Sequence, residues 1–194
     1  MNAAVIDFLS SRTSAPIDLM TGPGPSDAEI ETMIRIASRV PDHGRLAPWR
    51  FILYRGDIRH EIGEKLAALA NRIEGSLPEA RLAKERTRFS RAPLVIGVIS
   101  VAHPNAKIPQ WEMLLSGGAA AMNLVLAANA LGYGANWITN WYSDVPEGRA
   151  ILGLKEDERV IGFVHIGTFA GEAPERPRPD VSGLVSDYSG PVEG

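Results

Sequence analysis

The sequence predicts an α+β fold in which a central sheet, mixed or antiparallel, is flanked by helices and crossed by one long buried helix. The expected elements alternate irregularly, with few units of the strand–helix–strand length that a parallel sheet requires. The apolar stretch from Trp111 to Leu131 is long enough for a helix of about 30 Å. The 194 residues suit a single domain, 1–194, with no repeat and no internal boundary.

The stretch 111–131 organises the prediction because apolar side chains occupy nearly every direction around its helical axis. Its polar positions do not gather into one solvent stripe: Glu112, Ser116, Asn123 and Asn129. A helix that is apolar all round is buried, either in a core or in a membrane. Small residues at 117–121 make the stretch only moderately hydrophobic and would let another helix approach closely. We therefore expect a core helix that also lines a dimer interface.

The N-terminal part is predicted to form three helices and one strand. Ser26 and Glu29 have the spacing of a capping box, and Pro41 closes the helix that follows them. Aromatic and β-branched residues after Pro48 favour a strand. Apolar residues also recur at helical spacing near the N-terminus and again after this strand, which predicts two more helices. The predicted helices span 2–11, 26–39 and 58–73, and the strand spans 49–54.

The C-terminal part supplies the remaining strands. Continuous apolar runs predict strands at 94–101, 135–141 and 160–168, with a short helix at 146–152. The basic stretch 79–91 contains interleaved glutamates, which favours a solvated helix face over a nucleic-acid site. The tail from Gly171 is rich in proline and too polar to pack alone, so it could wrap over the body or over a partner subunit.

Composition excludes several classes of function. A net charge of -3 and a pI near 5.8 give no electrostatic footprint for nucleic acid. The chain has no cysteine, and its four histidines lack metal-ligand spacing, so we expect no metal site. Phosphate-loop, dinucleotide-binding and serine-hydrolase motifs are also missing. The N-terminus lacks the features of a signal peptide, and we expect no membrane association and a cytoplasmic location.

Three places could bind a ligand. Arg12 is followed by two hydroxyl residues, which together can hold a phosphate through charge-assisted hydrogen bonds, or can simply end a helix. Arg39 and His43 flank a proline-bounded loop that could surround an anion, or could satisfy a helix C-terminus. Trp137 follows a glycine-flanked turn, where its ring could face a planar ligand or lie in the core.

These places belong to an ordered set of motifs. The segments are Arg12-Thr13-Ser14, Arg39-Val40-Pro41-Asp42-His43, Ala47-Pro48-Trp49-Arg50-Phe51, Arg91-Ala92-Pro93-Leu94-Val95, Pro109-Gln110-Trp111-Glu112, the turn 131–137, the strand 161–168 and Arg176-Pro177-Arg178-Pro179. In this order they resemble the FMN-dependent nitroreductase family, in particular its small, single-domain bacterial NAD(P)H nitroreductases. The chain departs from that pattern at Ala47, where most relatives have Gln, at Thr13 and at Arg45.

The resemblance implies a nitroreductase-like fold, FMN as cofactor and NADPH or NADH as electron donor. It also implies a homodimer with FMN sites at the subunit interface. The acceptors would be nitroaromatics, quinones or similar small planar molecules, reduced in a ping-pong reaction by hydride transfer. The flavin carries the chemistry in such enzymes, so we expect no catalytic acid–base residues.

Site residues follow from the same resemblance. Those implied for FMN are Arg12, Thr13, Ser14, Arg39, His43, Trp137, Ile138, Thr139, Arg176 and Arg178. Those implied for NAD(P)H are Ala127, Ala128, Asn129, Ala130, Leu131 and Gly132. Three alternatives stay open: the same fold with other flavin chemistry (dehalogenation, enone reduction or flavin destruction), an FMN-binding dimer without turnover, and a membrane-anchored protein using 111–131.

Overall fold

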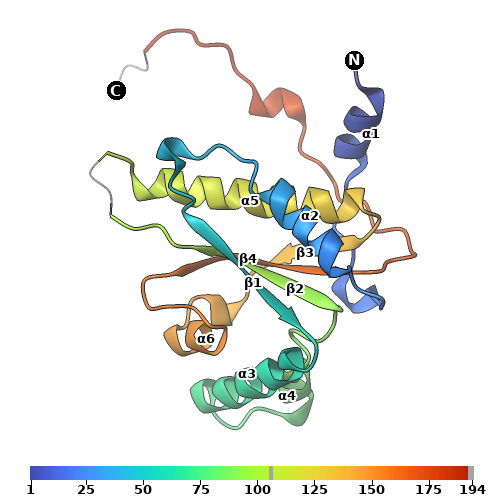
Figure 1. The fold of residues 1–194 in the computed structure, drawn as a ribbon, viewed down its shortest axis with the longest axis vertical. Coiled ribbons are helices and arrows are strands. Elements are labelled where there is room, and N and C mark those ends of the chain that lie inside the picture. The colour runs from blue at the N-terminus through green and yellow to red at the C-terminus, as the bar shows by residue number, and fades with distance from the viewer. Residues whose placement is uncertain (105–106, 192–194) are drawn as a thin grey trace.

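The computed structural model describes residues 1–104 and 107–191, which form three layers around a four-stranded sheet (Figure 1). The strands are β1 (Trp49–Arg55), β2 (Leu94–Ser100), β3 (Gly134–Ile138) and β4 (Arg159–Gly167). They lie in the order β1-β2-β4-β3, and each neighbouring pair is antiparallel. The α+β prediction is confirmed, and the sheet is antiparallel rather than mixed.

One face of the sheet is covered by α5 (Gln110–Ala130) and α2 (Asp27–Ala37). Ser26 and Glu29 form the predicted capping box at the start of α2. Apolar residues of both helices pack with alternate side chains of β2 and β4 in one core, which includes Leu124, Ile96 and Val164. Trp137 of β3 lies on this face, because it pairs in register with Val164 of the same core.

The opposite face is covered by α3 (Ile58–Glu74), α4 (Glu79–Arg86) and α6 (Pro146–Ile151) (Figure 1). Its core is aromatic, with the ring of Phe89 within 5.6 Å, between centroids, of the rings of three neighbours: Tyr54, Tyr142 and Phe163. All four side chains are at most 3% exposed. A single chain therefore closes this side of the sheet completely.

The basic stretch 79–91 is not wholly the solvated face that its composition predicts. Glu85 is fully buried and Arg88 is 7% exposed. Their side chains pair through two hydrogen bonds of 3.0 and 2.8 Å, and Trp141 Nε1 donates a third bond of 3.0 Å to Glu85. A buried charge is tolerated when it is paired in this way. The partner that buries this pair comes from a distant part of the sequence, so the local pattern could not predict it.

The α5 helix is buried on its sheet side and open on the other. Leu124 and Ala121 are fully buried, whereas Leu115 is 64% and Trp111 61% exposed. The helix is long and apolar enough to cross a membrane, but half of its most apolar part is buried inside the fold, as in the core helix of a soluble protein. Within one chain it is therefore not covered on every side.

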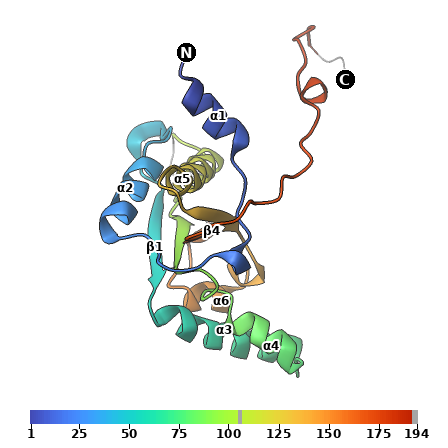
Figure 2. The same ribbon diagram turned by 90° about the vertical axis from the view of Figure 1, so that its right-hand side faces the viewer.

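Both ends of the chain extend from the body on the α5 side (Figure 2). Helix α1 (Ala3–Ser11) contains no buried residue, although Val5, Ile6 and Leu9 are apolar. The tail after β4 contains a short 3-10 helix, Val181–Leu184, and apolar side chains that are more than two-thirds exposed: Val181, Leu184, Val185 and Tyr188. In one chain these apolar residues have nothing to pack against.

Candidate functional site

The arginines predicted at the two ends of the chain lie together. Arg12, Thr13 and Ser14 follow α1, and with Pro174, Arg176 and Arg178 of the tail they line a small cavity of about 40 Å³. We call these residues, without Pro174, the arginine cluster. Arg178 pairs with Glu175 at 2.7 Å, whereas no carboxylate in the described part of the chain pairs with Arg12 or Arg176. Two uncompensated guanidinium groups beside two hydroxyls form a donor set suited to a phosphate.

The loop that carries Arg39 and His43 is fixed by polar side chains of α5. Asn123 Nδ2 donates to the carbonyl of Arg39 at 3.1 Å, and Ser116 Oγ donates to the carbonyl of Pro41 at 2.7 Å. Asp42 closes the turn by accepting hydrogen bonds from two backbone N–H groups at 3.1 and 2.8 Å. The loop is therefore held in a fixed position along the axis of α5.

His43 lies at the N-terminal end of α5. Its Nδ1 is 2.6 Å from Oε2 of Glu112, and the imidazole remains largely exposed. Together with Pro41, these two residues line a shallow pocket of about 270 Å³ whose floor is the open side of α5: Leu115, Ser116 and Ala119. A carboxylate at this distance orients the imidazole ring. We call Arg39 and His43 the loop pair.

These bonds explain why the polar residues of α5 form no stripe. Glu112, Ser116 and Asn123 each hold part of the loop at 39–43, and Asn129 Nδ2 donates to the carbonyl of Tyr133 at 2.9 Å. The sequence contained the signal, since polar residues scattered over a buried helix need partners. It did not identify the partners of Glu112, Ser116 and Asn123, because these lie far away in the chain.

Trp137 lies on the α5 side of the edge strand β3. Its side chain is 37% exposed, and Nε1 donates to the carbonyl of Ile161 at 3.3 Å. The ring rests against Gly162, where an added Cβ would lie 1.8 Å from Nε1. Gly162 is thus required for the indole to lie close to the sheet. Of the two residues predicted beside Trp137, Ile138 packs against the small core of Ala15, Ile17, Met20 and Ala92, and Thr139 is exposed. The predicted strand 135–141 ends at Ile138, because Asn140 caps a 3-10 helix that begins at Trp141.

The segment predicted to bind NAD(P)H is divided by the fold. Ala127 is 2% exposed and Ala128 is fully buried against the sheet, so neither side chain offers a surface to a nucleotide. For these two residues the sequence prediction needs correction, because they face the core rather than solvent. Ala130 and Leu131 are exposed, and Asn129 and Gly132 line a pocket of about 230 Å³ that also includes Thr13 of the arginine cluster.

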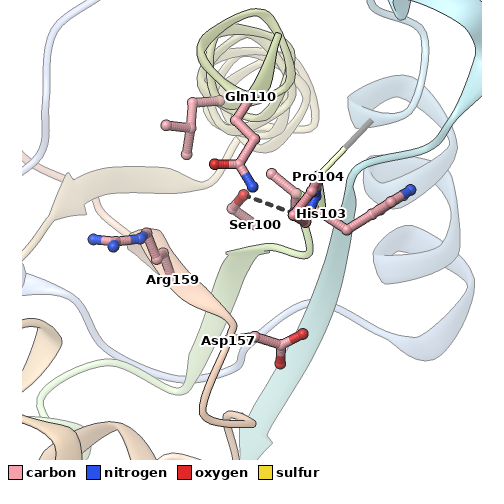
Figure 3. A pocket seen from close by; sticks show the side chains of 8 residues that line it. Ser100, His103, Pro104, Gln110, Asp157 and Arg159 are labelled. Atoms are coloured by element: carbon pink, nitrogen blue, oxygen red, sulfur yellow. Dashed lines mark hydrogen bonds between the residues drawn. The ribbon is translucent and has the colours of Figure 1, made fainter. Parts of the chain in front are cut away.

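A further pocket lies at the N-terminal end of α5, and none of the predicted ligand-binding residues lines it. It has a volume of about 180 Å³ and a polar lining that includes Ser100, Gln110, Asp157 and Arg159. Figure 3 shows Gln110 extending from the start of α5 toward Ser100, with Asp157 and Arg159 coming from the approach to β4. Its lining mixes both signs of charge and does not by itself select a ligand.

The strongest pKa shifts belong to the closed face of the sheet. Burial lowers the pKa of His165 to about 3, and burial raises the pKa of Tyr142 to about 12. Both groups lie in the core and do not reach the arginine cluster or the loop pair. In the described residues no group of three His, Asp or Glu side chains could hold a metal ion. The arrangement is therefore suited to binding and orienting an anionic, planar cofactor.

Comparison with known proteins identifies the family and supports the fold. The nitroreductase family matches residues 12–168. A protein of Haemophilus influenzae named "Putative NAD(P)H nitroreductase" is 37% identical over 150 residues, which cover 77% of this chain and 80% of that protein. The fold matches a nitroreductase-like protein of Bacillus cereus (TM-score 0.80, 22% identity, 96% of each chain). It also matches a nitroreductase with bound FMN from Bacteroides fragilis (TM-score 0.69, 19% identity, 95% of this chain and 98% of that one). The chain belongs to the nitroreductase family, a family of oxidoreductases.

Proposed function

We propose that the protein is an FMN-dependent NAD(P)H oxidoreductase that works as a homodimer, with each FMN held by both subunits. Its acceptors are nitroaromatics, quinones or similar planar molecules, which use the same place as the nicotinamide donor in turn. The proposed compartment is the cytoplasm. The observation that carries the proposal is the position of His43 and the arginine cluster at opposite ends of α5.

The arginine cluster fits the phosphate end of FMN. Its guanidinium groups supply positive charge and paired N–H donors, and the hydroxyls of Thr13 and Ser14 supply further donors. A monoester phosphate presents three acceptor oxygens, so a cluster of this kind satisfies it from several sides. The tail closes the cluster by contributing Arg176 and Arg178.

His43 is too far from the arginine cluster to share that FMN within one chain. It contacts Glu112 near the start of α5, whereas Thr13 lines a pocket with Asn129 near its end. At about 1.5 Å of rise per residue, these two helix positions are about 25 Å apart. This separation exceeds the length of an FMN molecule, which supports the supply of His43, and with it the loop that carries Arg39, by a second chain.

A two-fold dimer through the open side of α5 brings the sets together. Symmetry about an axis across the middle of the helix packs α5 antiparallel to its copy. The loop pair of one subunit then lies near the arginine cluster of the other. The same contact would bury the exposed apolar residues Trp111 and Leu115 of α5. It would also offer a surface against which Val5 and Leu9 of α1 and Val185 of the tail can pack.

The protein residues bind and orient, while bound FMN supplies the hydride and electron transfer. Trp137 provides an apolar surface for the flavin ring at the end of β3, and Gly162 lets the indole stay close to the sheet. The side chain of Ile138 lies on the opposite face of the strand, so its contact with FMN would come from its backbone. Arg39 and His43 approach from the partner and limit the access of water. No acid–base residue is assigned.

The visible absorption spectrum of the purified protein tests the proposal, recorded before and after anaerobic addition of NADPH and then NADH. Flavin bands that bleach, and that recover when a nitroarene or quinone is added, would support the oxidoreductase and identify its donor. Flavin bands that neither nucleotide bleaches would instead favour a flavin-binding dimer without turnover. A protein that takes up no FMN would contradict the proposal.

A further inference from the structure

The segment that carries the arginine cluster is tied to the edge strand β3. Ala15, directly after Ser14, donates its backbone N–H to the carbonyl of Ala135 at 3.2 Å. The carbonyl of Ala15 accepts a hydrogen bond of 2.7 Å from Nδ2 of Asn136. The chain therefore runs along the open edge of β3 for one residue and is bonded on both sides of Ala15.

Packing holds Ala15 in the same place. The residue is 3% exposed and belongs to a small core with Ile17 and Met20, against which Phe169 also packs. An added Cβ at Gly134 would lie 3.0 Å from the Cβ of Ala15 and 2.6 Å from that of Phe169. The segment is thus pressed onto the start of β3, and only a glycine there leaves enough room.

Asn136 is the side chain that fixes this segment. Within the described part of the chain, two hydrogen bonds connect residues 12–15 to other segments. One is donated by the side chain of Asn136, and the other is the backbone bond to the carbonyl of Ala135. Arg12 makes no ion pair within the described residues, so Ala15, through its packing and these two bonds, is where the start of the cluster is attached to the body. An anion-binding group that is not held in place pays an entropic cost when it is ordered by the ligand.

We propose that Asn136 is a positioning residue for the phosphate end of FMN, acting through Ala15 on Arg12, Thr13 and Ser14 without touching the cofactor. This inference rests on the proposed FMN function. It gives a role to a residue of β3 whose side chain points toward the first segment of the chain. The bond that it makes orders the cluster before the ligand arrives.

The test compares FMN with riboflavin, which has the same ring and ribityl chain but no phosphate. The full-length dimer is loaded with either flavin, and the dissociation constant is obtained from fluorescence recovery on dilution. Asn136→Ala removes the donor, and Asn136→Leu removes it while keeping a similar shape. Asn71→Ala is the matched control, because the side chain of Asn71 also bonds to the backbone, its Oδ1 accepting from the N–H of Leu77 at 2.8 Å, but on the closed face.

Loss of one such bond should raise the dissociation constant for FMN about fivefold in both Asn136 variants. The constant for riboflavin should change less than about twofold, and Asn71→Ala should shift neither, even if it lowers the melting temperature. Equal weakening of both flavins, or unchanged FMN binding, would overturn the positioning role while leaving the proposed function intact. Failure of the unaltered protein to bind FMN would overturn both, so the two failures can be told apart.

Discussion

The two faces of the sheet are completed in different ways. On the α3 side, Phe89 and its aromatic neighbours are buried within a single chain. On the α5 side, Leu115, Trp111 and Trp137 remain partly or largely exposed. The first face is finished by folding alone. The second face still has apolar surface and uncompensated positive charge, which is the surface where a second subunit and a cofactor are expected to bind.

The difference shows how one helix can serve both folding and function. The sheet side of α5 holds the core through Leu124, while its polar residues hold the loop at 39–43 from the open side. Substitutions on the sheet side of α5 should therefore affect folding stability, and substitutions on its open side should affect binding.

A charge on the sheet side of α5 should have the largest effect. Leu124→Asp places a carboxylate in a fully buried position and should cost more than about 4 kcal/mol of folding free energy. Leu115→Glu, on the open side, should leave a folded monomer that binds no FMN. Circular dichroism melting and sizing chromatography measure the two outcomes. A soluble, flavin-loaded dimer of the Leu124 variant would show that the role of α5 has been misread.

Truncating the aromatic core should come next. Phe89→Ala removes a fully buried ring and should destabilise the protein by about 4 kcal/mol in urea unfolding. FMN binding by the fraction that stays folded should be unchanged. Trp137→Ala should show the reverse, with a smaller loss of stability and weaker flavin binding. If both variants lost flavin to the same degree, the two faces would not be independent.

Removing one arginine from the cluster should have an intermediate effect. Arg12→Ala should weaken FMN binding by about 1.5–3 kcal/mol, because a charge-assisted bond to phosphate is lost. Fluorescence titration measures this change. Arg72→Ala is the control, since Arg72 is a largely exposed arginine of α3 on the closed face. Unchanged FMN affinity in the Arg12 variant would refute its role at the phosphate.

The closed face should also respond to pH. Burial lowers the pKa of His165 to about 3, so the folded protein binds fewer protons than the unfolded chain between pH 6.5 and that value. Stability should therefore fall as the pH falls, by about 2 kcal/mol between pH 7 and pH 5. Urea unfolding at the two pH values tests this, and His165→Leu should remove most of the difference. An equal pH dependence in that variant would assign it to other groups.

Local patterns predicted most of the fold. The capping box at Ser26, the apolar run of β2 and the long helix α5 are each set by residues close in sequence, and the structure confirms them. Burial of Glu85 with Arg88 was not predicted, because it depends on Trp141 from another element. The sequence predicted that a second subunit covers part of α5 but not which side stays open, since the pattern of apolar residues is the same whether a sheet or a second subunit covers them.

The candidate site was predictable in part. Arg12 and Arg178 were expected at one phosphate from motif resemblance, and the structure places them around one cavity. The contributions of Gly162 and Asn136 could not be foreseen from spacing. Gly162 is needed because an indole from another strand lies on it, and Asn136 matters because its amide reaches the carbonyl of Ala15. Both depend on which segments lie side by side in the folded chain.

The central claim is that each FMN is held by the arginine cluster of one subunit and the loop pair of the other. Coexpression of Arg12→Ala and Arg39→Ala chains carrying different affinity tags gives a mixed dimer that tests it. One site then has both changes and the other has neither, so the account predicts one tightly bound FMN per mixed dimer, while both single-variant homodimers lose it. A mixed dimer as poor in FMN as the homodimers would place both residues in a site within one chain and contradict the account.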